Sequence, residues 1–66
     1  MKNRLKIERA IANLTQADLA EKIAVSRQTI NAIEAGKFVP STVLALKLSK
    51  LFDKPVNEIF ELEDED

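Results

Sequence analysis

The chain has 66 residues, near the lower size limit for a domain that folds unaided, and its formal net charge is −1. It contains no cysteine and no histidine, which excludes disulfides and most transition-metal sites, so we expect no cofactor. No apolar run approaches the roughly 20 residues that span a bilayer, so we expect a cytoplasmic protein without a membrane partner.

Helices are the expected elements, because one glycine and two prolines are too few for a chain of short strands and turns. Thr15, with Asp18 three residues later, makes a capping box, and Ser26 and Ser41 each precede an apolar-periodic run. Gly36 marks a helix end, because glycine enters the left-handed conformation without steric cost. In chain order the patterns predict five helices, over residues 4–13, 16–23, 27–35, 42–52 and 55–60.

Apolar side chains recur at helical spacing in these segments and should form one core, which makes the fold class all-α. The expected core residues are Leu5, Ile11, Leu14, Leu19, Ala20, Ile23, Ile30, Ile33, Leu44, Leu48, Leu51, Phe52, Ile59 and Phe60. After the last helix, Leu62 stands between Glu61 and Glu63, and this alternation favours a short extended segment.

The second and third predicted helices are joined by only three residues, 24–26. So tight a connection cannot lay two helices antiparallel, which indicates a helix-turn-helix, the unit whose second helix enters the major groove of DNA. Arg27 and Gln28 open that second helix and have the chemistry to pair with guanine and adenine. Asn31 shares their face and is the third predicted base contact, although each could also be an ordinary solvated residue.

Four other polar residues are predicted to contact DNA phosphates. Gln16 opens the first helix of the motif, where backbone amides and its own side-chain amide can face a phosphate. Ser26 and Thr29 are short hydroxyl donors, and for Ser26 helix capping alone is the alternative. Lys37 follows the second helix of the motif and should meet the sugar-phosphate chain.

The chain resembles the XRE family of helix-turn-helix regulators, which includes the lambdoid phage repressors and Cro proteins. The stretches that carry this resemblance are Thr15-Gln16-Ala17-Asp18-Leu19-Ala20, Val25-Ser26-Arg27-Gln28-Thr29-Ile30 and Ile33-Glu34-Ala35-Gly36-Lys37. Pro40-Ser41 and residues 44–47 and 55–60 continue it over nearly the whole chain. It implies a five-helix lambda-repressor-like DNA-binding domain and an internal ion pair between Arg9 and Glu34.

Two positions depart from the family pattern. Ala24 stands where the turn usually has glycine, and Ala35 stands where asparagine usually precedes Gly36. The first departure predicts a turn that accepts a β-carbon or carries slight strain. Neither departure touches the predicted base contacts.

The resemblance also implies a homodimer, because free-standing members of the family pair without a separate sensor domain. Val56, Ile59, Phe60 and Leu62 are the predicted dimer residues, since a chain this small is not expected to bury all four. We therefore expect a repressor that binds a palindromic operator in double-stranded DNA, with no small-molecule substrate evident.

The charge is divided unevenly along the chain. Residues 1–52 hold nine Lys and Arg against four Asp and Glu, a net of +5, whereas residues 53–66 hold one Lys against seven acidic residues, a net of −6. The sequence thus predicts a DNA-binding domain over residues 1–60 and an acidic tail over residues 61–66. The tail could serve solvation, repel incorrectly approaching DNA, or form part of the dimer interface.

Two other classes of function are alternatives to a DNA-binding regulator. An antitoxin or another protein-interaction module could use the acidic tail to neutralise a basic partner, and a neighbouring toxin-like reading frame would favour it. An enzyme is the weakest alternative, because acid-base chemistry without histidine or cysteine would depend on Asp, Glu or Lys in a chain too small to enclose them.

Overall fold

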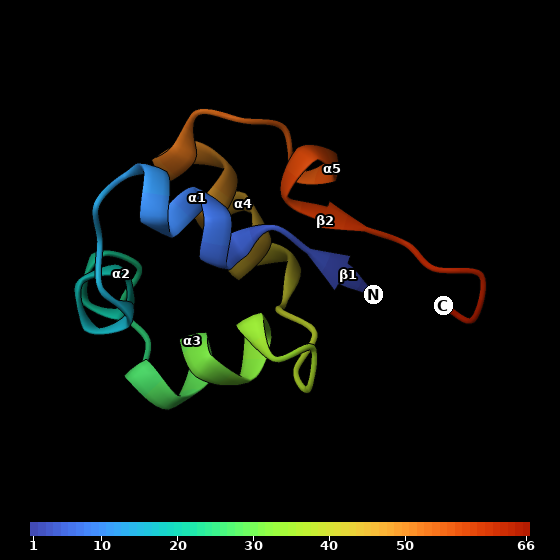
Figure 1. The fold of residues 1–66 in the computed structure, drawn as a ribbon, viewed down its shortest axis with the longest axis horizontal. Coiled ribbons are helices and arrows are strands. Elements are labelled where there is room, and N and C mark those ends of the chain that lie inside the picture. The colour runs from blue at the N-terminus through green and yellow to red at the C-terminus, as the bar shows by residue number, and fades with distance from the viewer.

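The computed structural model describes residues 1–66 and has five α-helices with two short strands. In chain order the elements are β1 (Lys2–Asn3), α1 (Leu5–Ile11), α2 (Gln16–Lys22), α3 (Arg27–Glu34), α4 (Thr42–Phe52), α5 (Val56–Ile59) and β2 (Phe60–Glu61). The predicted helical fold class is confirmed, and α3 lies along one edge of the molecule while both chain ends lie together at another (Figure 1). No helix is long and apolar enough to cross a bilayer.

Hydrogen bonds at the helix starts confirm the predicted caps. The Thr15 hydroxyl accepts from the Asp18 N–H at 3.0 Å, and the Asp18 carboxylate accepts from the Thr15 N–H at 3.0 Å, which completes the capping box. The bond from the Thr15 backbone is also the main cause of the lowered pKa of Asp18. Ser26 and Ser41 cap α3 and α4 in the same way, each accepting from a backbone N–H at 3.2 Å.

Left-handed backbone conformations mark several helix ends. Gly36 has φ of 74° and ends α3 as predicted, while Asn13, with φ of 57°, explains why α1 is shorter than the predicted 4–13. Ala24, in the turn between α2 and α3, has φ of 59°. A β-carbon in this conformation crowds the following carbonyl and costs about 1–2 kcal/mol, so the departure from glycine at this position stores strain.

The core consists of ten buried apolar side chains, all of them among the residues expected there. They are Leu5, Leu19, Ala20, Ile23, Ile30, Ile33, Leu44, Leu48, Ile59 and Phe60. The expectation was wrong for Ile11 and Leu51, which are 70% and 37% exposed. Ile11 follows the buried Glu8 by three positions, but it is the last residue of α1, and its side chain stays exposed at the helix end.

Glu8 is the only buried charged residue, and its carboxylate binds the Lys54 ammonium group at 2.9 Å. Glu8 belongs to α1, whereas Lys54 lies in the loop between α4 and α5, so the ion pair joins segments 46 positions apart. Removal of Lys54 would leave an uncompensated buried carboxylate, whereas removal of Glu8 would leave an ammonium group whose side chain is 38% exposed. The sequence pattern did not indicate this pair.

The two strands pair in antiparallel fashion, with Lys2 opposite Glu61 and Asn3 opposite Phe60. The extended segment predicted near the end of the chain therefore exists, although it starts at Phe60 and pairs with the chain's own first residues. The Asn3 side chain also donates to the Ile33 carbonyl at 2.9 Å, which ties β1 to the end of α3.

The acidic residues that follow β2 lie beside the first residue of the chain. The Met1 amino group lies 3.0 Å from a Glu63 carboxylate oxygen and 3.1 Å from one of Asp66. Hydrogen bonds to Glu63 and then Asp66 raise the pKa of this amino group. Part of the acidic tail is thus folded back onto the domain.

The four predicted dimer residues differ in burial within one chain. The chain does not bury all four, but Ile59 and Phe60 are 1% and 7% exposed, so they belong to the core. The reason is the strand pairing, since the Arg4 N–H donates to the Ile59 carbonyl at 2.8 Å and Phe60 is paired with β1. Val56 is half-buried, and Leu62 is 75% exposed.

Strain at Ala24 gives a stability prediction. Ala24→Gly should raise the free energy of unfolding by about 0.5–1 kcal/mol, because the relief of left-handed strain exceeds the entropy that glycine adds to the unfolded chain. Ala10→Gly, at an exposed position inside α1, should instead lower it by about 1 kcal/mol. Thermal and urea unfolding measure both, and a loss of stability in Ala24→Gly would contradict the strain.

Candidate nucleic-acid interface

The two helices of the motif, α2 and α3, pack against each other across the turn over residues 23–26. Ile30 and Ile33 are buried in the core, so one side of α3 faces it. Arg27, Gln28 and Asn31 are exposed and follow the helical period on a side that points away from the core. The structure therefore brings the three predicted base-contacting residues onto one surface, called the recognition face below.

The residues predicted to contact phosphates border the recognition face. Ser26 is exposed and Thr29 half-buried, with their hydroxyl oxygens 2.9 Å apart at the start of α3. Lys37 is exposed in the loop after α3 and forms no ion pair. Gln16 is half-buried at the first position of α2.

An ion pair lies behind the recognition face. Arg9 Nε lies 2.7 Å from Glu34 Oε2, Arg9 Nη2 lies 3.2 Å from Glu34 Oε1, and Arg9 Nη1 donates to the Leu14 carbonyl at 2.9 Å. The hydrogen bond to Glu34 raises the pKa of Arg9. Burial of Glu34 opposes its ionisation, but the hydrogen bonds from Arg9 and Gln16 outweigh burial and lower its pKa. Both groups are therefore charged at neutral pH.

The Gln16 side-chain amide connects this ion pair to the recognition face. Its Nε2 donates to Glu34 Oε1 at 3.1 Å and to Asn31 Oδ1 at 3.3 Å, while its Oε1 accepts from Arg27 Nη1 at 3.4 Å. A carboxylate can only accept and a guanidinium can only donate, so the two charged neighbours fix which end of the amide faces which partner. A continuous network thus runs from α1 through α2 to α3.

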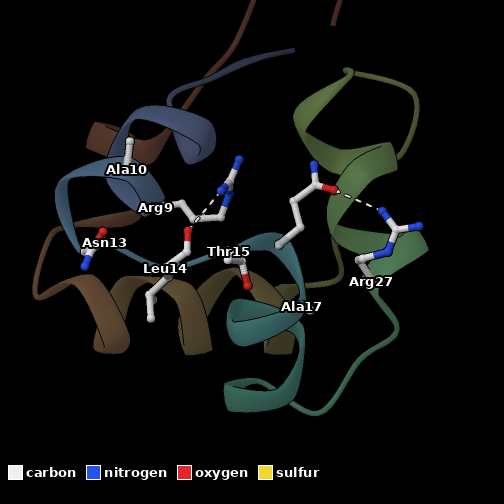
Figure 2. A pocket seen from close by; sticks show the side chains of 8 residues that line it. Arg9, Ala10, Asn13, Leu14, Thr15, Ala17 and Arg27 are labelled. Atoms are coloured by element: carbon white, nitrogen blue, oxygen red, sulfur yellow. Dashed lines mark hydrogen bonds between the residues drawn. The ribbon is translucent and has the colours of Figure 1, made fainter.

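A hollow of about 490 Å³ opens beside the network, between the end of α1 and the first turns of α2 and α3. Figure 2 shows Arg9 and Arg27 on different sides of it, with the loop that carries Leu14 and Thr15 between them. Arg9, Gln16 and Arg27 contribute to the lining, which contains no acidic residue, and the Arg9 guanidinium is also bound to Glu34. This donor set suits an anion such as a DNA phosphate.

Comparison with known proteins decides the family. A family model described as a helix-turn-helix matches residues 5–59. The chain belongs to the XRE family of helix-turn-helix regulators.

Several curated relatives of this XRE-family protein have nearly the same length. An uncharacterized HTH-type transcriptional regulator of Methanocaldococcus jannaschii is 56% identical over 66 residues, with all of both chains covered. The uncharacterized HTH-type transcriptional regulator YgzD of Bacillus subtilis is 46% identical over 65 residues, which is 98% of each chain. A similarly named protein of Archaeoglobus fulgidus is 39% identical and covers all of this chain and 93% of its own length.

Sequence reasoning missed two features of this XRE-family site. Asn13 was not singled out, yet it lines the hollow through the loop between α1 and α2. Gln16 was assigned to a phosphate contact alone, and its bonds to Arg27, Asn31 and Glu34 were not foreseen. These partners lie 11–18 positions from Gln16, so no local spacing rule indicates them.

The depressed pKa of Glu34 gives a testable pH dependence. Because the folded pKa lies below the unfolded one, the unfolded state binds more protons in acid, and the contribution of Glu34 is lost as pH falls below about 4. Glu34→Gln should lower the free energy of unfolding by about 2 kcal/mol at neutral pH.

The stability difference between wild type and Glu34→Gln should shrink as pH falls towards about 3. Urea titrations over this range measure it, and subtraction of the two curves removes the contributions of all other acidic groups. Glu21→Gln, on an exposed residue of α2 without an ion pair, serves as the control. A difference that stays constant or grows in acid would contradict the assignment.

Proposed function

We propose that this protein is a transcriptional repressor that binds a palindromic operator in double-stranded DNA as a homodimer. The recognition face of α3 carries the proposal, because it combines exposed Arg27, Gln28 and Asn31 on one surface. The relatives are named HTH-type transcriptional regulators, which agrees with a role in transcription. The proposed activity is binding, with no chemical step.

In this proposal the polar residues divide into two groups. Arg27, Gln28 and Asn31 contact base edges in the major groove, where Arg pairs with guanine and Gln or Asn pairs with adenine. Gln16, Ser26, Thr29 and Lys37 contact phosphates and set the position of α3 on the duplex.

The distribution of charge supports the approach to DNA. Residues 1–52 carry a net charge of +5, and these residues include α2 and α3. The acidic tail follows β2 and projects from the end of the molecule where the two strands pair (Figure 1). The negative charge is thus kept apart from the recognition face, and the tail's carboxylates at Glu63 and Asp66 already bind the Met1 amino group.

Selection from random DNA tests this function directly. The wild-type protein should enrich a twofold-symmetric sequence, with affinity that falls steeply as salt rises because phosphate contacts release counterions. Arg27→Ala should relax the preference at one base position of each half-site by about 1–3 kcal/mol. Lys37→Ala should weaken binding to all sequences alike, and it should lower the slope of log affinity against log salt concentration by about one per subunit.

Fluorescence anisotropy titrations on the selected site and on single-base variants measure both effects. Lys2→Ala provides a matched loss of positive charge on β1, which pairs with β2 where the two chain ends meet, and should change neither the base preference nor the salt slope. The proposed roles would be contradicted if no sequence is enriched. They would also be contradicted if Arg27→Ala and Lys37→Ala lower the binding affinity equally for every site.

The proposed dimer places a second copy of the chain on an apolar groove of about 240 Å³. The groove is lined by Met1, Val39, Pro40, Thr42, Ala45, Leu46, Val56 and Phe60. Leu46 is 57% exposed, and the exposed side chains of Val39 and Val43 flank it on the same part of the molecule. Contact between two such apolar surfaces is self-complementary, as a twofold interface requires.

The requirements of DNA also point to a second copy. Each chain has one recognition helix of eight residues, and two half-sites on one side of B-DNA lie about 34 Å apart. One chain therefore supplies only one of the two recognition helices that the two half-sites need. The groove belongs to α4, α5 and the loop before α4, which leaves α2 and α3 free for DNA.

Leu46→Asp tests the dimer without removing a core side chain. The variant should sediment as a monomer at about ten-micromolar concentrations and lose protection of the symmetric site, because a charge would be buried unpaired. Ile11→Asp is the matched control, since Ile11 is equally apolar and 70% exposed but lies on α1 outside the groove. A monomeric wild-type protein, or a Leu46→Asp variant that still dimerises, would exclude this interface.

A further inference from the structure

We infer that contact between Gln16 and a DNA phosphate releases Asn31 for base recognition, so that the two contacts form as one coupled step. The inference rests on the proposed function and adds to it a coupling between the phosphate contact of Gln16 and the base contact of Asn31. Its basis is the hydrogen-bond network at Gln16 together with the hollow beside that residue.

In the unbound protein both N–H donors of the Gln16 amide are engaged. One partner is Glu34 Oε1 at 3.1 Å and the other is Asn31 Oδ1 at 3.3 Å. An amide nitrogen has only two hydrogens. A phosphate oxygen can therefore receive a hydrogen bond from this group only if one of the present acceptors gives it up.

The two acceptors differ in the strength with which they hold the amide. Glu34 is a charged carboxylate in a partly buried position, and Arg9 keeps it fixed through two hydrogen bonds. Asn31 is a neutral amide whose bond to Gln16 is longer and exposed. Hydrogen bonds to charged acceptors are the stronger ones, so the phosphate displaces Asn31 and leaves Glu34 in place.

The hollow defines where the phosphate arrives. Its lining brings Gln16 together with Arg9 and Arg27, and none of the lining residues is acidic. An anion seated there lies within reach of the Gln16 amide. Once released, Asn31 has both ends of its side-chain amide available for adenine.

Glu34 is therefore a positioning residue in this mechanism. It does not contact DNA, but it holds Gln16 at the edge of the hollow while the Asn31 bond breaks and the phosphate bond forms. The ion pair with Arg9 connects this position to α1.

A double-mutant cycle on the selected operator tests the coupling. In the wild type, Asn31→Ala loses a base contact but also removes a bond that binding must break, so its effect is reduced. In a Gln16→Ala background that bond is already absent. Asn31→Ala should therefore weaken operator binding about threefold more in the Gln16→Ala background than in the wild type, the equivalent of one exposed hydrogen bond.

The control cycle pairs Gln16→Ala with Gln28→Ala. Gln28 lies on the recognition face but has no hydrogen bond to Gln16, so these two changes should be additive. Gln16→Met repeats both cycles with a side chain of similar size that lacks the donor. Circular dichroism checks that every variant is folded at the temperature of the titrations.

Side-chain amide resonances provide a readout that does not depend on affinity. In the free protein, Gln16→Ala should shift the Asn31 side-chain amide signal, because a direct partner is removed. In the DNA complex the same change should leave that signal where it is in the wild-type complex.

The outcomes separate this inference from the proposed function. Additive Gln16 and Asn31 effects, or a smaller effect of Asn31→Ala in the Gln16→Ala background, would show that the bond persists in the complex and would overturn the coupled release alone. Failure of the wild type to bind any selected duplex would overturn both. The coupled release would also be overturned if Gln16→Ala leaves the Asn31 side-chain amide signal of the free protein unshifted.

Discussion

The Arg9 guanidinium holds the DNA-facing half of this small domain together. It binds both carboxylate oxygens of Glu34 and the Leu14 carbonyl, and Glu34 in turn accepts from Gln16. One charged group thereby joins α1, the loop that follows it and the end of α3, with α2 joined through Gln16. A ten-residue apolar core fixes the approximate packing of these helices, and the ion pair adds the directional bonds that hydrophobic contact lacks.

The opposite end of the molecule is built on different contacts. The pairing of β1 with β2, the buried Glu8 and Lys54 ion pair and the Asn3 bond to the Ile33 carbonyl tie the two ends of the chain to the helices. These contacts bury Ile59 and Phe60 within the chain, while Val56 stays half-buried. They leave the groove on α4 and α5 as the apolar surface available to a second copy.

In the absence of DNA, hydrogen bonds already hold side chains of the recognition face. Asn31 and Arg27 are each bonded to Gln16, so the side chains proposed to contact bases satisfy one another before DNA arrives. Such bonds limit the rotamers of long polar side chains and reduce the entropy lost on binding. In the coupled release that we infer, part of the binding energy is used to exchange hydrogen-bond partners, which makes base recognition depend on contact with the phosphate.

The sequence by itself determined the five helices and their caps, because these depend on neighbours within four positions: Thr15 with Asp18, Ser26 and Ser41 at helix starts, and Gly36 at a helix end. The same local period placed Arg27, Gln28 and Asn31 on one face. Only the tertiary structure decided that Ile11 is exposed, that Glu8 is buried with Lys54, that Ile59 and Phe60 belong to the core, and that Gln16 links the ion pair to Asn31. Each of these depends on residues 11 or more positions apart, or on which side of a helix meets its neighbours, and periodicity along the chain carries no information about such distant partners.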